Sequence, residues 1–326
     1  MVHKTIWITW ERQRRTFELS NALGIELYII SSERRALIRY LVSSMRTLFI
    51  ILREKPKTLI IQNPSIVLAV LACILKPLFS YRLIVDRHSN FLLGKTQYTF
   101  MDKVFLLLSD YSIKKADLTI VTNKNLRKHI EAKGGRGLVL TDRLPTPRVA
   151  FKHNSKRSNI VTFICTYASD EPYKEVIMAA SLLDKNIEIY ITGNSKKADP
   201  EVFEGLSENV VVTGFISDEE YDELLQKSDI IMDFTKLENC MVCGAYEAVA
   251  MGKPLITSNT HVLRDYFTHG VLHIDHSPQS ICKAIMEVYD SYNEYLDGIQ
   301  HLKDNIEKNW SAMFNELKDY IDYTYK

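Results

Sequence analysis

Short apolar runs recur along this chain, and a stretch with helical periodicity follows most of them. In the first half the runs lie at residues 6–9, 27–31, 58–61, 83–85, 118–121 and 138–140. Regular alternation of short strands with helices is typical of a parallel sheet that carries helices on both faces. The sequence therefore predicts an α/β fold of the doubly wound, Rossmann-like kind.

A polar segment at residues 142–158 interrupts this alternation. It contains two prolines and lacks apolar periodicity, which is typical of a linker. Beyond it the alternation resumes, with strands expected at residues 160–165, 187–192, 210–212, 230–234 and 255–258. We therefore expect two Rossmann-like domains, residues 1–150 and 151–305, that face each other across a cleft. Residues 306–326 are expected to form a helix that packs back toward the first domain.

Composition argues against several functional classes. The formal net charge of the 326 residues is +1, so no excess of positive charge indicates binding to nucleic acid. No apolar run approaches the roughly 20 residues of a spanning helix, and the first residues lack the features of a secretory signal. The odd number of cysteines, 5, is typical of reduced thiols in a cytoplasmic protein. No G-x-G-x-x-G follows a strand, which disfavours a dinucleotide-dependent dehydrogenase.

The strongest functional signal is the segment at residues 233–254, where a strand, a loop and a helix follow one another. Ligands of open α/β sheets bind at the carboxyl ends of the strands, where such loops lie. We expect the helix at residues 240–251 with Asn239 as its N-cap, so that its first N–H groups offer a site for a diphosphate. Glu247 lies in this otherwise apolar helix and needs partners. These are either the two hydroxyls of a ribose or a neighbouring Lys or Arg.

The end of this segment resembles the glycosyltransferases of the GT-B superfamily, specifically the retaining family 4 type, in the run Glu247-Ala248-Val249-Ala250-Met251-Gly252-Lys253-Pro254. The resemblance implies that Glu247 holds the ribose of a nucleotide sugar. Family members carry another Glu eight positions earlier, near the donor sugar, where this chain has Asn239 preceded by Glu238. Either Asn239 or Glu238 is then expected at the transferred sugar. The residues expected around the nucleotide sugar in this loop are Cys240, Met241 and Gly244.

Weaker resemblances extend over residues 158–275. Gly193 and Asn194 follow a strand, as in the turn before the nucleotide pocket of the family. Gly214 and Phe215 match the turn where family members meet the base. Lys174 is a loose match to the lysine that neutralises the diphosphate. The resemblance adds these residues to the expected nucleotide-sugar site.

Candidate residues of the first domain follow two of its expected strands. Trp10, Arg12 and Arg15 follow the first strand, where arginines suit a phosphate or an anionic acceptor; a solvated first helical turn is an equally good interpretation. Asp86 and His88 follow the fourth strand. The resemblance implies that His88 lies near the donor sugar, with Asp86 as the base if the enzyme inverts.

These features together predict a glycosyltransferase that moves a sugar from a nucleotide sugar to a glycan or lipid-linked glycan. The resemblance implies a retaining reaction in the synthesis of a bacterial surface polysaccharide such as a capsule or exopolysaccharide. No Asp-x-Asp tripeptide occurs, so we expect a metal-independent reaction and no cofactor besides the donor substrate. The alternatives are a catalytically silent GT-B subunit or scaffold, which the Asn239 departure favours, and a nucleotide-sugar epimerase.

A partly apolar helix with repeated arginines bears on localisation. Its arginines are Arg35, Arg39, Arg46 and Arg53. Such a helix suits the surface of an anionic membrane. We therefore expect a cytoplasmic protein with peripheral contact at the inner face of the membrane; the alternative is a domain helix with one solvated basic face.

Overall fold

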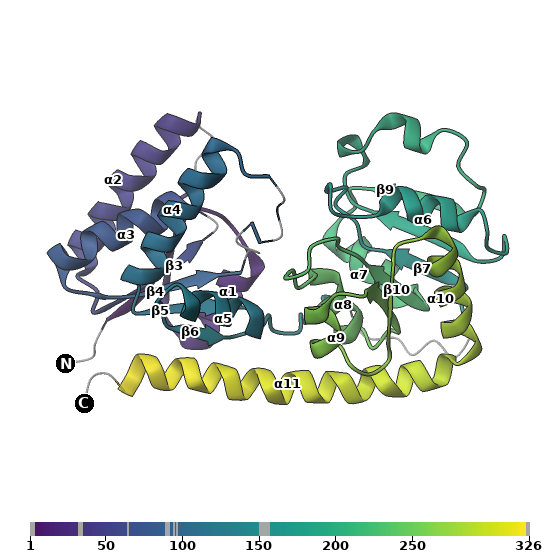
Figure 1. The fold of residues 1–326 in the computed structure, drawn as a ribbon. Helices are drawn as coiled ribbons and strands as arrows, with labels where there is room; N and C mark the ends of the chain where they lie inside the picture. The colour runs from purple at the N-terminus through teal and green to yellow at the C-terminus, as the bar shows by residue number, and fades with distance from the viewer. Residues whose placement is uncertain are drawn as a thin grey trace. The chain divides into compact units, whose positions relative to one another are not determined.

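The computed structural model describes residues 4–31, 35–63, 65–88, 92–93, 95, 97–149 and 157–323. The chain forms two compact units (Figure 1). The first unit comprises Met1–Arg143 with Trp310–Lys326, and the second comprises Leu144–Asn309. The boundaries expected at residues 150 and 305 lie a few residues from these, and part of the expected linker, residues 150–156, lies outside the described residues.

The first unit is built around a 6-stranded parallel sheet with the order β2-β1-β3-β4-β5-β6. Its strands are β1 (Thr5–Thr9), β2 (Glu26–Ile29), β3 (Thr58–Asn63), β4 (Arg82–Arg87), β5 (Leu118–Val121) and β6 (Gly137–Val139). The connecting helices are α1 (Arg14–Leu23), α2 (Ala36–Glu54), α3 (Ile66–Phe79), α4 (Phe100–Lys115) and α5 (Lys124–Ala132).

Helices cover both faces of this sheet. Ile6, Trp7 and Ile8 of β1 are all 0% exposed, and alternate side chains of a strand point to opposite faces. Ile6 and Ile8 pack in one core with side chains of α2 and α3. Trp7 packs in another core with α1 and with the end of α11 (Tyr292–Tyr323), through residues such as Leu317. Burial of the strands on both faces explains why they read as short, nearly continuous apolar runs.

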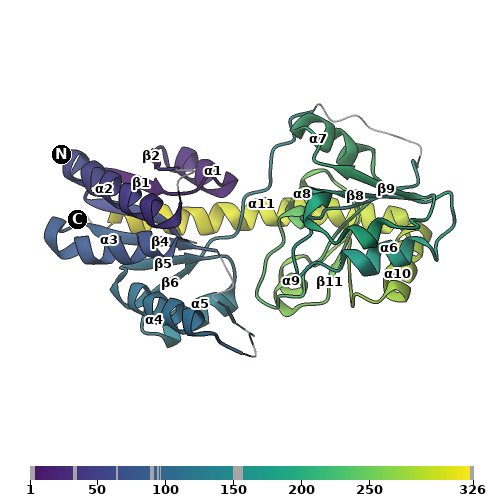
Figure 2. The ribbon, with the colours of Figure 1, turned by 90° about the horizontal axis from the view of Figure 1, so that it is seen from above.

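The second unit, seen from above in Figure 2, repeats this architecture. Its 6-stranded parallel sheet has the order β12-β11-β10-β7-β8-β9. Its strands are β7 (Ile160–Phe163), β8 (Glu188–Thr192), β9 (Val210–Gly214), β10 (Ile230–Asp233), β11 (Leu255–Ser258) and β12 (Val271–Ile274). Its helices are α6 (Tyr173–Ala180), α7 (Asp218–Lys227), α8 (Cys243–Ala250), α9 (His261–Tyr266), α10 (Pro278–Asp290) and the start of α11, with 3-10 turns at Ser195–Lys197 and Pro200–Phe203.

Local sequence signals account for several helix ends in this unit. Ser217 caps α7 by accepting a hydrogen bond from the N–H of Glu220, whose carboxylate accepts from the backbone N–H of Ser217 in return. Gly252, in the left-handed region at φ 66°, lies just beyond α8. The doubly wound parallel sheets predicted from the sequence are confirmed.

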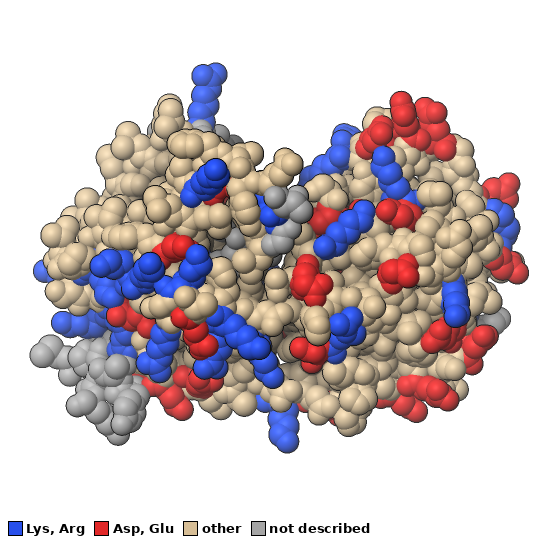
Figure 3. Space-filling view, viewed as in Figure 1, with Lys and Arg blue, Asp and Glu red and all other residues tan. Residues whose placement is uncertain are grey.

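The outer surface of the first unit is unusual over α2, α3 and α4. Helix α3 packs against both α2 and α4. On the face seen in Figure 3, few charged side chains lie over the upper part of this unit, where α2 is drawn in Figure 1. Many of their large apolar side chains are exposed, Leu37 and Leu78 among them at 86% and 73%. No helix in the described part of the chain is both long and apolar enough to cross a membrane.

Candidate functional site

Helix α8, which carries Glu247, begins at Cys243 rather than at residue 240. Its N-cap is Val242, which makes no side-chain capping bond, so the expectation that Asn239 caps this helix was wrong. The chain turns before the helix instead, where the N–H of Cys240 donates to the carbonyl of Leu237 at 3.3 Å. Cys240 and Asn239 are half-buried in this turn, and Met241 is buried.

A buried carboxylate that sequence reasoning missed occupies the start of α8. Asp233, the last residue of β10, is 6% exposed and accepts hydrogen bonds from the backbone N–H groups of Gly244 and Ala245. A Cβ at Gly244 would lie 2.6 Å from Asp233 Oδ2, which explains a glycine there. Burial, with the nearby charges of Glu247 and Glu171, raises the pKa of Asp233 well above its ordinary value. These two helix N–H groups therefore serve an internal carboxyl group.

Glu247 is half-buried and is oriented by a tyrosine from the neighbouring helix. Tyr221 of α7 donates its hydroxyl to Glu247 Oε2 at 2.6 Å. Burial and the adjacent Glu247 raise the pKa of Tyr221 well above its ordinary value, so the phenol stays a donor. The sequence of α7 gave no sign of this contact, because the two residues are 26 positions apart in sequence.

Glu238, the alternative to Asn239 at the transferred sugar, is exposed and bonded elsewhere. Its Oε1 accepts from the backbone N–H of His261 at 2.6 Å, at the first residue of α9. A carboxylate at a helix start is favoured by the helix dipole. The carboxylate of Glu238 therefore stabilises α9, and Asn239 is the residue of this pair that remains in the turn before α8.

The loop after β7 is closed by its own hydrogen bonds. Glu171 accepts from the backbone N–H of Thr166 at 2.8 Å and from that of Ala168 at 3.0 Å. Gly193, at the end of β8, allows this loop to approach, because a Cβ there would lie 2.0 Å from the carbonyl oxygen of Cys165. Asn194 caps the 3-10 turn that follows by accepting from Lys196 N–H at 3.2 Å. Gly193 and Asn194 thus shape the carboxyl edge of the second sheet.

Two further residues expected in the nucleotide-sugar site lie on the surface. Lys174 of α6 is exposed and lies 3.9 Å from a carboxylate oxygen of Asp199. Phe215 follows Gly214 at the end of β9 and is 89% exposed. Gly214 has a φ of 66°, which a glycine adopts without strain. The turn therefore presents an aromatic ring to solvent beside the carboxyl end of β9.

In the first unit, Arg15 is buried in an ion-pair network. It is 7% exposed, and its Nη2 donates to Asp86 Oδ1 at 3.0 Å and to the carbonyl of Leu140 at 2.8 Å. Its Nη1 donates to Asp142 at 2.6 Å. All five N–H groups of an arginine are donors, and here internal acceptors take most of them. The expectation that Arg15 contacts a phosphate or an acceptor is therefore not supported by its position, because its partners are within the fold.

Asp86 and His88 lie together at the end of β4. Asp86 is fully buried, and although burial raises its pKa, the Arg15 guanidinium and His88 lower it to about 2. His88 Nδ1 lies 3.7 Å from Asp86 Oδ2 and has no hydrogen-bond partner in the described part of the chain. Asp86 is thus a poor general base, and it orients His88 electrostatically. Residues 89–91, which continue this motif, lie outside the described residues.

Trp10 and Arg12 line a cavity of about 610 Å³. Trp10 is largely buried, and its Nε1 donates to Thr47 Oγ1 of α2 at 3.0 Å. Arg12 is exposed at the edge of the cavity. The lining comes from the segments that follow β1, β2 and β3, and from α2 and α4. The cavity therefore lies at the carboxyl edge of the first sheet, where ligands of such sheets bind.

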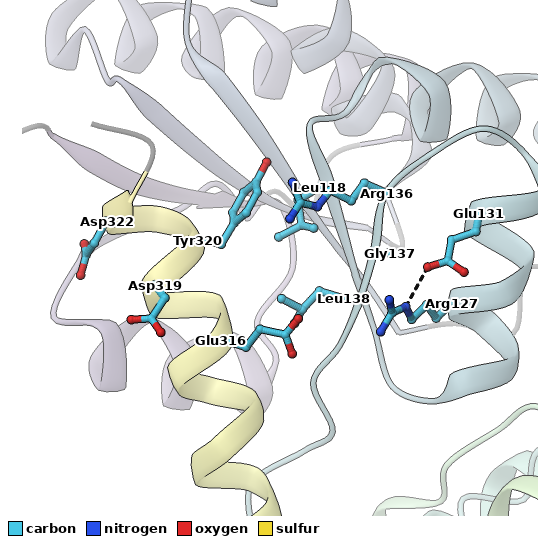
Figure 4. A pocket seen from close by; sticks show the side chains of 10 residues that line it. All are labelled: Leu118, Arg127, Glu131, Arg136, Gly137, Leu138, Glu316, Asp319, Tyr320 and Asp322. Atoms are coloured by element: carbon cyan, nitrogen blue, oxygen red, sulfur yellow. Dashed lines mark hydrogen bonds and ion pairs between the residues drawn. The ribbon is translucent and has the colours of Figure 1, made fainter. Parts of the chain in front are cut away.

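A second cavity, of about 760 Å³, lies at the opposite edge of the same sheet. It is lined by the first residues of β5 and β6, Leu118 and Gly137, and by the end of α11. Figure 4 shows Tyr320 of α11 beside Arg136, whose guanidinium carbon lies 4.8 Å from the ring centre. Ligands of such sheets bind at the carboxyl ends of the strands, and this cavity lies at the amino ends. We therefore interpret it as a gap where α11 packs against the sheet, and not as a candidate active site.

Comparison with known proteins agrees with this architecture. Residues 146–305 match the family model of Glycosyl transferases group 1. Anabaena Alr3699/HepE in complex with UDP and glucose has a TM-score of 0.78 at 11% identity, covering 98% of this chain and 100% of that chain. Sucrose-phosphate synthase from Thermosynechococcus elongatus has a TM-score of 0.77 at 11% identity, covering 99% of each.

A third similar structure belongs to another kind of enzyme. A putative UDP-N-acetylglucosamine 2-epimerase from Listeria monocytogenes has a TM-score of 0.65 at 14% identity, covering 91% of this chain and 90% of that chain. At these identities the likeness shows the fold alone. The sequence has no significant match among curated proteins. The domain at residues 146–305 belongs to the Glycosyl transferases group 1 family, and the chain that carries it is a glycosyltransferase with the GT-B fold.

Proposed function

We propose that this chain transfers a sugar from a UDP-sugar to a glycan or lipid-linked glycan in the synthesis of a bacterial surface polysaccharide. The acceptor oxygen forms its bond to the anomeric carbon as the bond to the β-phosphate oxygen breaks, and UDP leaves with the electron pair. The acceptor proton passes to the departing phosphate or to a nearby base. Uridine is chosen because the HepE structures contain UDP, UDP with glucose, or UDP-glucose.

The observation that carries this proposal is the Glu247 carboxylate. It lies on α8 of the group 1 domain, half-buried, with Oε2 oriented by Tyr221. A carboxylate accepts several hydrogen bonds, and the two hydroxyls of a ribose are suitable donors. The exposed ring of Phe215 suits the base, because aromatic faces stack on heterocycles. Glu247 therefore binds the ribose, and Tyr221 is its positioning residue.

Retention and metal independence are parts of the same proposal. Retention is supported by the resemblance of the segment around Glu247 to retaining enzymes. Metal independence is supported by the lack of an Asp-x-Asp tripeptide anywhere in the sequence. His88, which lies beside the Asp86 carboxylate, is proposed to bind a hydroxyl of the transferred sugar. If His88 proves dispensable for transfer, Asn239 in the turn before α8 is the other candidate for this role.

Nucleotide binding is the direct test. We expect UDP to raise the melting temperature of the full chain more than GDP, ADP or dTDP at equal concentration. Loss of a charge-assisted hydrogen bond costs about 1.5–3 kcal/mol, so Glu247→Gln should weaken UDP binding roughly 10- to 100-fold. Glu219→Gln, an exposed carboxylate on α7, is the matched control and should bind as the unaltered chain does. Equal binding by Glu247→Gln would refute the ribose assignment.

Transfer is tested separately from binding. Release of UDP from UDP-glucose or UDP-N-acetylglucosamine, with sugar incorporated into bacterial glycolipid extract, supports the enzyme. UDP binding with no release from any donor and extract would instead favour a silent subunit. Interconversion of the donor sugar without incorporation would favour an epimerase.

Peripheral membrane contact is proposed through α2 and its neighbours. The apolar side chains Leu37, Leu41 and Phe49 recur on one face of α2 and are 86%, 64% and 62% exposed. On α4, Phe100 and Leu107 are 78% and 72% exposed. A solvent-exposed apolar area of this breadth on a folded domain indicates an interaction surface.

The charges on α2 favour an anionic bilayer as the partner of this surface. Arg35, Arg39, Arg46 and Arg53 accompany the exposed apolar residues, and no Asp or Glu occurs between residues 36 and 53. Basic residues beside an inserted apolar face are attracted to anionic headgroups. We expect the full chain to co-sediment with phosphatidylglycerol-containing vesicles and Leu41→Gln/Phe49→Gln to do so less. The exposed Met178→Gln on α6 is the control. Absence of sedimentation at low salt would exclude the contact.

A further inference from the structure

The cavity of about 610 Å³ in the first unit lies where the strand order reverses. The chain passes from β1 to β2 on one side and returns to β3 on the other side of β1. At such a switch point the loops diverge and leave space for a ligand beyond the carboxyl ends. Residues that follow all three strands line the cavity: Trp10–Arg12, Ile30–Ser31 and Ser65–Val67.

The charged groups of the lining suit an anion. Arg12 comes from the loop after β1, and Arg39 comes from α2, so two guanidinium groups reach the cavity from different elements. Glu11 is also in the lining and is exposed, as both arginines are. Its Oε2 accepts from Gln13 Nε2 at 3.5 Å, and the two guanidinium groups leave the lining with a net positive charge. Arg39 lies with its guanidinium carbon 5.1 Å from the ring centre of Tyr40, a further lining residue, which limits the orientations of that arginine.

The start of α3 adds backbone donors. Ser65 is the N-cap of this helix, and the first backbone N–H groups of a helix have no acceptor within it. Ser65, Ile66 and Val67 line the cavity. The N-terminus of a helix of this length attracts an anion through these donors and through its dipole.

An independent observation comes from a buried hydroxyl. Ser43 of α2 lines the cavity and is 1% exposed. Its Oγ has no hydrogen-bond partner among the residues that the structure describes. A buried polar group without a partner is costly, so such groups in native proteins call for an explanation. An oxygen-rich ligand in the cavity would supply the missing partner.

We propose that this cavity binds a phosphate group of the acceptor substrate. Arg12 and Arg39 are its cationic partners, and Ser43 with the start of α3 supplies neutral donors. Guanidinium groups pair with phosphate through two parallel hydrogen bonds, which fixes orientation as well as charge. The inference rests on the proposed transferase function and specifies its acceptor as a phosphorylated one. Because α2 carries both this lining and the exposed apolar face, a phosphate borne by a lipid would reach the cavity along the same helix.

Phosphate binding by the full chain is the primary test. Inorganic phosphate is titrated while its phosphorus NMR linewidth is followed, with saturating UDP present. We expect Arg12→Gln/Arg39→Gln to bind about ten-fold more weakly or worse, and Ser43→Ala to show a smaller loss. Arg46→Gln removes an exposed arginine from α2 outside the lining and should bind normally. No binding by the unaltered chain, or equal binding by all variants, would overturn the proposal.

Competition distinguishes the source of the phosphate. Glucose 1-phosphate and dodecyl phosphate in neutral detergent micelles are each added to the phosphate-loaded chain. Stronger displacement by dodecyl phosphate assigns a lipid-linked acceptor, and stronger displacement by glucose 1-phosphate assigns a soluble one. Failure of both to displace phosphate contradicts the proposal. The UDP-induced thermal shift should be the same in Arg12→Gln/Arg39→Gln as in the unaltered chain. If UDP shifts the melting temperature of neither protein, the donor assignment is refuted, and the result of the phosphate titration still stands.

Discussion

Replacement of Arg15 by methionine tests whether this arginine is part of the fold or of a ligand site. Arg15 is 7% exposed, and its Nε donates to both carboxylate oxygens of Asp86, at 3.2 and 3.1 Å. Methionine keeps much of the apolar stem and removes the guanidinium. The fully buried Asp86 then loses the cation that stabilises its charge, whereas a phosphate-binding arginine would be lost with little effect on stability.

The structure sets the size of the expected effect. The pKa of Asp86 is about 2 in the folded chain, and a carboxyl shifted this far below its unfolded value contributes about 2–3 kcal/mol of stability at pH 7. Removing one partner of a buried pair also leaves an uncompensated charge, so the total loss is about 3–5 kcal/mol. In the unaltered chain this contribution is present above the unfolded pKa near 4 and is lost as the pH falls toward 2. In Arg15→Met the Asp86 carboxyl has lost its cation and should take up a proton more readily. The difference in unfolding free energy between Arg15→Met and the unaltered chain should therefore become smaller as the pH falls from 7 to 4.5.

Tryptophan fluorescence isolates the relevant unit. The chain has 3 tryptophans, Trp7, Trp10 and Trp310, and all belong to the first unit. Urea unfolding followed by fluorescence at pH 7 and at pH 4.5 therefore reports on the unit that contains Arg15. The double variant Arg15→Met/Asp86→Leu should recover much of the lost stability. A loss below about 1 kcal/mol at pH 7, or a double variant no more stable than the single one, would refute the reasoning.

Three further predictions concern single positions, and the first has a matched control. Gly193→Ala should lower the unfolding free energy of the second unit by more than about 3 kcal/mol, whereas Gly205→Ala, whose new Cβ would meet no atom within 4 Å, should cost about 1 kcal/mol; urea unfolding followed by circular dichroism compares them. Leu317→Ala should cost about 2–5 kcal/mol in the fluorescence transition, because this side chain is fully buried. Folding raises the pKa of the Asp233 carboxyl, so the unaltered chain should lose stability as the pH rises from 5 to 8, whereas Asp233→Asn should not. The melting temperature of Asp233→Asn should therefore rise relative to that of the unaltered chain over this range. A difference in melting temperature that stays the same at all pH values would contradict this.

The parallel sheets were predictable because their strands are buried on both faces and so appear as apolar runs between helices. Strand β12 was missed because all of its residues are only half-buried and it includes His273. Its position is set by pairing with β11, for example Leu272 with Ile256, rather than by its own composition.

The candidate site was predictable only in part, because several of its contacts join residues distant in sequence. Glu247 stood out as a charge in an apolar helix, but its partner Tyr221 belongs to another helix. Arg15 and Asp86 are 71 positions apart, so an arginine after a strand looked available for a ligand. The start of α8 was misplaced because Asp233, ten residues before it, takes the place of a local N-cap.

The place of α11 in the first unit has a consequence for synthesis of the chain. The second unit is one continuous stretch, Leu144–Asn309, whereas the first also needs residues from Trp310 onward. The face of the first sheet that contains Trp7 is covered by Leu317 and Ile321. During translation this face stays uncovered until the stretch of α11 that contains these residues has left the ribosome, although most of the unit is synthesised first. We therefore expect the nascent first unit to be more prone to aggregation than the second unit. The second unit should reach its native state before the first.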